Sequence, residues 1–193
     1  MRLFALATLV IAAIAYFIWY SPSVSPCNAL DSEIDMTEQP QSDESKRTAL
    51  IQSIREQDPD AGSFAHWGLS DSRPLVTVEA FFDGNHDLGS IGPNLLAHPG
   101  IETFAQTLRA LRDRQDVQDV WIGITEIEEN TTGVWPFTDT IYILTTASTD
   151  TISGHLSALC PDEVSPLPAN DPQRSRLLAP LTPSHNILYA WWD

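Results

Sequence analysis

The residues best suited to chemistry lie in one glycine-rich loop, FFDGNHDLGSIGPNL. Asp83, Asn85 and Asp87 alternate along this loop like the first three oxygen ligands of a calcium-binding loop. The pattern then departs from such a loop, because Leu88 replaces the expected glycine and Asn94 replaces the glutamate that would chelate the ion. We therefore predict no metal site.

Two interpretations of the loop remain open. In the first, Asp83, His86 and Asp87 supply general acid–base groups to a small hydrolase or a ligand-binding enzyme. In the second, the Asp and Asn side chains only accept hydrogen bonds from nearby backbone N–H groups, while glycines permit positive φ. Because the loop joins a predicted core strand to a helix, we still choose it as the ligand-binding site. The candidate ligand-binding residues are Asp83, Asn85, His86, Asp87 and Asn94. The sequence identifies no catalytic residue, and we expect no cofactor.

Hydrophobic periodicity predicts an α+β fold around this loop. The predicted strands cover residues 75–82, 117–128, 139–146 and 186–192, and the predicted helices cover residues 100–114 and 149–159. The resulting order is β-α-β-β-α-β. Right-handed crossovers would then give a ferredoxin-like antiparallel sandwich with both helices on one face of the sheet. The proline-rich residues between the last helix and the last strand are expected to form a surface loop.

The other face of the predicted sheet carries Trp121 and Tyr142, and it is too apolar to stay bare. Either residues 46–72 fold over this face, with Leu50 and Ile54 among the covering side chains, or a partner protein covers it. The second alternative makes Trp121 and Tyr142 a candidate interaction face.

An uncharged run of 18 residues, Leu3–Tyr20, lies close to the N-terminus. As a helix it would be about 27 Å long, which suits a transmembrane segment that inserts in a lipid bilayer. Arg2 precedes the run, so the positive-inside rule places the N-terminus in the cytoplasm and the rest outside, at a bacterial inner membrane. A signal peptide that is cleaved after Ala15 and a lipoprotein anchored at Cys27 are the alternatives.

The predicted domain organisation has four parts. They are a transmembrane signal anchor at residues 1–20, an acidic flexible tether at 21–45, a short helix with a linker at 46–72, and the α+β domain at 73–193. The tether is rich in serine, proline and acidic residues, a composition that favours disorder.

Charge and cysteine content narrow the set of partners. The formal net charge is −16, with 26 acidic residues against 10 basic ones. Nucleic-acid binding is therefore not expected, since it requires clustered Lys and Arg, and a basic partner protein is favoured instead. Cys27 and Cys160 could form a disulfide outside the cytoplasm, where oxidation is permitted, or remain two free thiols.

Several strings in the sequence resemble those of a group of uncharacterised bacterial proteins. They are FFDGNHDLGSIGPNL followed by HPG, then WPFTDTIYILTTAS, and finally LCPDEV. The resemblance runs from Val76 to Val164 and implies a bacterial source and a single type of domain. No activity, cofactor or site residue comes with it.

Taken together, these features favour a membrane-tethered, extracytoplasmic binding module that recognises another protein. An immunity-like role, in which the domain neutralises a toxic protein, falls within this class. One alternative is an enzyme that uses the loop at residues 83–94, and another is a structural component of an envelope complex.

Overall fold

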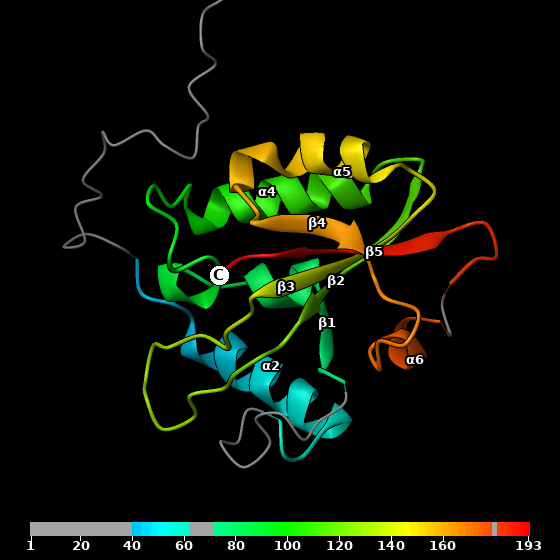
Figure 1. Ribbon diagram of the computed structural model, residues 1–193. Coiled ribbons are helices and arrows are strands. Elements are labelled where there is room, and N and C mark those ends of the chain that lie inside the picture. Colours follow the sequence, from blue (N-terminus) through cyan, green and yellow to red (C-terminus); the bar gives the residue numbers. More distant parts are fainter. Residues whose placement is uncertain (1–39, 62–71, 179–180) are drawn as a thin grey trace, which may run out of the picture.

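The computed structural model describes residues 40–61, 72–178 and 181–193, which fold around a five-stranded antiparallel sheet (Figure 1). The strands lie in the order β1-β2-β3-β5-β4. They are β1 Leu75–Thr77, β2 Val117–Gly123, β3 Thr140–Thr145, β4 Glu163–Pro166 and β5 Asn186–Trp191. The helices are α2 Glu44–Gln57, α3 Val78–Phe82, α4 Ile101–Arg112, α5 Thr149–Leu156 and α6 Arg174–Leu177, with short 3-10 turns η4 Leu88–Ser90 and η5 Ser157–Leu159.

Alternation along the central strands gives the sheet two apolar faces. Ile122 pairs with Ile141, whereas Trp121 pairs with Tyr142, which pairs in turn with Tyr189. Successive side chains of a strand point to opposite faces. The isoleucines therefore lie in the main core, and the aromatic residues lie in a second, smaller cluster.

The main core lies under α4 and α5, which run side by side over one face of the sheet (Figure 1). Phe104 and Leu108 of α4 and Leu156 of α5 have no exposed surface. Leu50 and Ile54 of α2 belong to the same core, and α2 lies near β1, away from α4 and α5. Burial of these apolar side chains holds the three helices on the sheet.

The second face packs against the segment between β4 and β5. Leu167, which follows β4, and Leu177 of α6 are both buried there against Tyr142. We expected residues 46–72 to cover this face. The described part of that range instead joins the main core, and residues 62–71 lie outside the part of the chain that the structure describes.

The ferredoxin-like topology predicted from the sequence is wrong. In that fold each β-α-β unit has another strand inserted between its two strands, but here β1 pairs directly and antiparallel with β2. One cause is that the predicted strand at residues 75–82 ends at Thr77. The Thr77 side chain accepts a hydrogen bond from the backbone nitrogen of Ala80 at 3.1 Å and thereby caps α3.

A further correction concerns the proline-rich segment after α5. We expected a loop without strands, but residues 163–166 form β4 at the edge of the sheet, beside β5. Pro166 ends this strand, a position where proline costs no ladder hydrogen bond. The edge strand adds a fifth strand to the four that were predicted.

The predicted transmembrane helix is not among the elements that the structure describes. Its residues, Leu3–Tyr20, lie outside the described ranges. Within residues 40–61, 72–178 and 181–193, none of the helices combines the length and the apolar character needed to cross a membrane.

Arg47 of α2 connects this helix to the long connection between β2 and β3 (residues 124–139, the β2–β3 connection). The side chain of Arg47 is only 4% exposed, and the guanidinium group donates hydrogen bonds to the backbone oxygens of Glu128 and Val134. It also forms an ion pair with Glu44. These contacts satisfy the buried charge and fix the connection against α2.

His98 connects the glycine-rich loop to the start of α4. Its Nδ1 accepts a hydrogen bond from the backbone nitrogen of Gly100, and its Nε2 lies 2.9 Å from the backbone oxygen of Ile91. The ring must therefore be neutral, with its proton on Nε2. Burial is the main cause that lowers the pKa of His98 below its ordinary value of 6.5.

The lowered pKa of His98 predicts a pH-dependent stability. The unfolded chain protonates this ring at a higher pH than the folded chain, so the free energy of unfolding falls as the pH drops below about 6.5. Urea denaturation between about pH 7.5 and pH 5 should show this decline. In a His98→Phe variant the decline should be smaller, and equal slopes in both proteins would contradict this role.

Replacement of Arg47 by methionine should strongly destabilise the domain. The substitution leaves two backbone oxygens without their donor, and each such loss costs about 1–3 kcal/mol where the oxygen stays buried. Urea denaturation monitored by circular dichroism measures the change. Lys46→Met removes an exposed cation from the next position, and the free energy of unfolding should stay nearly unchanged. Equal effects of the two substitutions would disprove the role of Arg47.

Candidate functional site

The glycine-rich loop is an ordered turn that its own side chains stabilise. Asn85 is 3% exposed, donates a hydrogen bond to the hydroxyl of Ser90 at 2.9 Å, and accepts one from the backbone nitrogen of Asp87. Gly84 and Gly92 adopt positive φ, as the turn interpretation predicts. At Gly84 a side chain would also collide with Asp43, just before α2.

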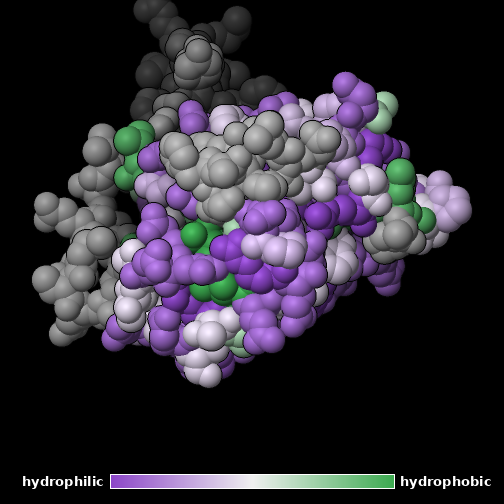
Figure 2. Space-filling model, turned by 90° about the horizontal axis from the view of Figure 1, so that it is seen from below, coloured by the Kyte–Doolittle hydropathy of each residue, from purple (hydrophilic) through white to green (hydrophobic). Residues whose placement is uncertain are grey.

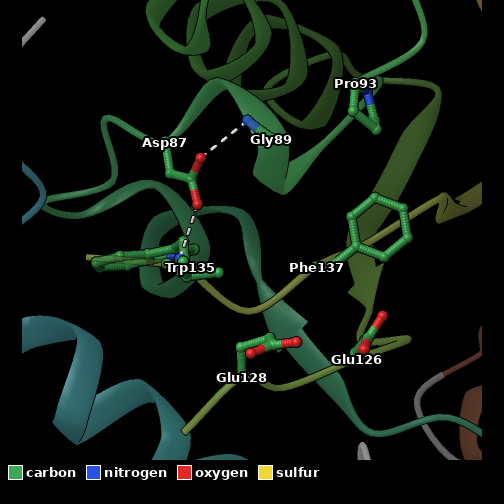
Figure 3. A pocket seen from close by; sticks show the side chains of 8 residues that line it. Asp87, Gly89, Pro93, Glu126, Glu128, Trp135 and Phe137 are labelled. Carbon is green, nitrogen blue, oxygen red and sulfur yellow. Dashed lines mark hydrogen bonds between the residues drawn. The ribbon is translucent and has the colours of Figure 1, made fainter. Parts of the chain in front are cut away.

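Asp87 links this loop to the β2–β3 connection. Its carboxylate accepts a hydrogen bond from the backbone nitrogen of Gly89 at 2.9 Å and another from that of Trp135 at 2.8 Å (Figure 3). Both oxygens thus have backbone partners. A second link lies nearby, where the backbone nitrogen of Thr138 donates to the oxygen of Ser90.

The structure does not bring the five candidate ligand-binding residues together. Asp83 forms an ion pair with Lys46, while the side chains of His86 and Asn94 are exposed. Asn85 is buried within the turn. Of the five, Asp87 lines the cavity described next. Among the described residues, no group of three or more His, Cys, Asp or Glu side chains is arranged to hold a metal ion.

A cavity of about 350 Å³, which we call the acidic pocket, opens between the glycine-rich loop and the β2–β3 connection. Figure 3 shows Asp87, Gly89 and Pro93 on one wall, with Glu126 and Glu128 on the opposite wall. The remaining lining residues are Val134, Trp135 and Phe137. Three carboxylates and two aromatic side chains therefore surround one cavity.

Glu126 and Glu128 differ from Asp87 in their availability. They lie two residues apart, and Figure 3 shows both side chains on the same wall of the pocket. Glu126 is a half-buried residue, and its carboxylate has neither a hydrogen bond nor an ion pair within the described part of the chain. Glu128 is exposed, and its carboxylate accepts one hydrogen bond, from the hydroxyl of Thr131.

The aromatic wall of the acidic pocket comes from the return segment of the β2–β3 connection. The backbone groups of Phe137 pair with those of Glu126, so the two side chains belong to neighbouring segments. Trp135 is 1% exposed and forms a fixed wall. The pocket can therefore attract a positive charge and contact an aromatic ring at the same time.

The sequence analysis missed Glu126, Glu128, Trp135 and Phe137. We placed Glu126 and Glu128 at the end of the predicted strand at residues 117–128, and gave no role to these two residues or to Trp135 and Phe137. Two segments of the sequence carried a usable signal. Glu126 and Glu128 stand two positions apart in EIEEN, and Trp135 and Phe137 stand two positions apart in VWPF. Only the pairing across the connection shows that the two sets meet.

The other candidate residues lie elsewhere. Tyr142 is 6% exposed in the second apolar cluster, and Trp121 is half-buried beside it. Cys160 follows η5 in a left-handed conformation with φ of 49°. Cys27 lies outside the described residues, so the disulfide remains a prediction.

Comparison with known proteins identifies the family. The model of the family described as "Uncharacterized protein YfbO family" matches residues 45–190, well over half of the chain. The chain belongs to this family. A relative from Escherichia coli (strain K12), named uncharacterized protein YfbO, is 29% identical over 122 residues, which are 63% of this chain and 84% of the relative. No solved structure matches the chain. The resemblance to uncharacterised bacterial proteins is thus confirmed.

Asp87→Asn should lower the free energy of unfolding by about 1–3 kcal/mol, because the amide can accept only one of the two backbone hydrogen bonds. Urea denaturation measures the loss. Asp83→Asn removes the same charge from an exposed side chain of the same loop and should leave the stability nearly unchanged. An Asp87→Asn variant as stable as the unmodified protein would show that the carboxylate does not fasten the loop.

Proposed function

We propose that this domain is a protein-interaction module whose acidic pocket receives a cationic side chain, Lys or Arg, of a partner protein. The observation that supports this proposal is the carboxylate of Glu126. This group belongs to a half-buried residue and has no partner among the described residues, and it lies beside Phe137 and Glu128 in a cavity large enough for one side chain. Such a carboxylate gains a charge-assisted hydrogen bond when a cation enters.

The aromatic wall suits the same ligand. Contact between a cation and an aromatic face contributes about 0.5–2 kcal/mol, with the larger values where water is excluded. Arginine fits best, because its planar guanidinium group can bind a carboxylate with two hydrogen bonds and stack on a ring. Glu126 and Phe137 offer both groups side by side.

The walls are held in place before any partner binds. Arg47 fixes the backbone at Glu128 and Val134, and Asp87 fixes it at Trp135. A preformed site loses less conformational entropy on binding than a mobile one. The acidic pocket therefore has the rigidity that specific recognition requires.

The charge of the whole chain supports the same class of partner. A net charge of −16 attracts a basic protein over some distance and speeds the encounter. Figure 2 shows that the lower face of the domain is mainly hydrophilic, with a small hydrophobic area near its centre. Neutralisation of a basic toxic protein, as in an immunity-like role, fits within this proposal.

An enzymatic role has less support. Both carboxylate oxygens of Asp87 accept backbone hydrogen bonds, and Asp83 is paired with Lys46. Two of the three proposed general acid–base groups, Asp83 and Asp87, are thus already engaged in the fold. The contacts of the acidic pocket therefore favour a role in binding over a role in proton transfer.

The location that we propose lies outside the cytoplasm, at the bacterial inner membrane. The uncharged run at residues 3–20 and the single arginine before it support this location. In that setting the domain would bind extracytoplasmic partners, including those of an envelope complex.

The double substitution Glu126→Gln and Glu128→Gln should weaken binding of a penta-arginine peptide at least tenfold. Loss of two carboxylates removes the charge-assisted hydrogen bonds, while the similar size of glutamine preserves the shape of the pocket. Isothermal titration calorimetry on the full-length chain at low salt measures the affinity.

A control with the same change in net charge distinguishes contacts within the acidic pocket from the electrostatic attraction of the whole protein. Glu56 of α2 and Glu102 of α4 are exposed and lie outside the acidic pocket. The double substitution of these two residues by glutamine should change the affinity less than twofold. If both double variants lost the same affinity, the binding would be nonspecific and the proposal would fail.

A further inference from the structure

A second cavity, of about 270 Å³, opens on the opposite side of the sheet from α4 and α5. Its lining includes Arg73, Tyr142, Leu167, Asp171 and Tyr189. We call it the tyrosine pocket. It shares no lining residue with the acidic pocket, and no part of the proposed function depends on it.

The walls of the tyrosine pocket are joined by a buried glutamine. Gln173 is 2% exposed, and its side chain both accepts a hydrogen bond from the backbone nitrogen of Arg73 and donates one to the backbone oxygen of the same residue. This reciprocal pair joins the segment before β1 to the segment before α6. The cavity is therefore part of the fold rather than a gap between loose loops.

The hydroxyl group of Tyr142 is the unusual feature of this cavity. The residue is 6% exposed, yet its hydroxyl makes no hydrogen bond with any residue that the structure describes. Among the described residues, the fully buried side-chain atoms without a partner are the indole nitrogens of Trp121 and Trp135, so the hydroxyl of Tyr142 keeps contact with solvent through the cavity, where a ligand can replace water. Burial raises the pKa of Tyr142 to about 12, so the group keeps its proton and can donate a hydrogen bond.

Tyr189, which pairs with Tyr142 on the neighbouring strand, shows the contrast. Burial and the neighbouring carboxylate of Glu163 raise the pKa of Tyr189, which also lines the cavity. The phenol of Tyr189 is thus influenced by a nearby carboxylate, whereas the hydroxyl of Tyr142 makes no hydrogen bond with the described residues. A ligand that enters the cavity can therefore accept a hydrogen bond from Tyr142.

Charged groups of both signs act on Tyr142. Arg73 bonds Asp139 and Thr140 through a single nitrogen, Nη1, which leaves its Nε and Nη2 without a hydrogen-bond partner in the described chain. Asp171 lies on the other wall and raises the pKa of Tyr142. A ligand oxygen near Tyr142 could therefore accept hydrogen bonds from Tyr142 and Arg73. If this oxygen were negatively charged, the carboxylate of Asp171 would repel it.

We propose that the tyrosine pocket binds a small molecule that carries a carbonyl or carboxylate oxygen. This oxygen accepts hydrogen bonds from the hydroxyl of Tyr142 and from Arg73, and the apolar part of the molecule lies against Leu167. The size of the cavity limits the ligand to a small molecule, because typical ligand pockets start at about 300 Å³.

Benzamide and benzoate are suitable probes, because they share an aromatic ring and differ in charge. Ligand-observed NMR on the full-length chain should show millimolar binding of at least one of them. Tyr142→Phe removes only the hydroxyl and should weaken that binding about tenfold or more. Thr151→Val of α5 is the control, since it removes a hydroxyl that lies outside the cavity, and the affinity should change less than twofold.

A second variant keeps the test decisive if Tyr142→Phe fails to fold. Asp171→Asn retains an oxygen that can accept the hydrogen bond from the backbone nitrogen of Gln173, but it removes the repelling charge. Benzoate should then bind several times more tightly, and the affinity for benzamide should not change. Absence of binding by both probes, or an affinity that neither Tyr142→Phe nor Asp171→Asn changes, would overturn the proposal.

Discussion

The buried guanidinium group of Arg47 is the contact on which the arrangement of the acidic pocket depends. A charged side chain that is 4% exposed is tolerated only where hydrogen-bond acceptors surround it. Here the acceptors are the backbone oxygens of Glu128 and Val134 together with the carboxylate of Glu44. The same contacts that satisfy Arg47 give a fixed shape to the β2–β3 connection, which has little regular strand pairing of its own.

Asp87 fixes the other side of the same connection, because it binds the backbone of Trp135 from the glycine-rich loop. The acidic residues of the pocket therefore have two different roles. The carboxylate of Asp87 is engaged by backbone nitrogens and acts as part of the fold. The carboxylate of Glu126 has no such engagement among the described residues and faces the cavity. The hydrogen bonds of Arg47 and Asp87 fix the walls of the pocket. The carboxylate of Glu126 therefore remains available to a ligand.

Periodicity in the sequence predicted a large part of the fold. The apolar stripe of α4 and the alternation of Ile122 with Trp121 follow directly from helix and strand geometry. The segment VEAFF was misassigned because its residues favour strands, whereas the capping side chain of Thr77 starts a helix there. The order of the strands could not be deduced, since it depends on which edges pair, and local patterns do not encode this choice.

The candidate site was predictable only in part, for a similar reason. The sequence identified Asp87 as a candidate because its side chain can bind ligands or protons. It did not identify the partner of Asp87, because that partner lies far away in the sequence. Glu126 and Phe137 come together through backbone pairing across a long connection, and Trp135 meets Asp87 only in the folded chain. Distances along the sequence therefore gave no indication of these contacts.

The location of the binding surface is the most direct test of this account. A ¹⁵N-labelled, full-length chain titrated with a penta-arginine peptide would report the affected backbone amides by NMR. We predict that the largest chemical-shift changes fall at residues 87–93 and 126–137. Changes concentrated on α4 and α5, or spread evenly over all acidic surfaces, would contradict the central claim that the acidic pocket is the site of recognition.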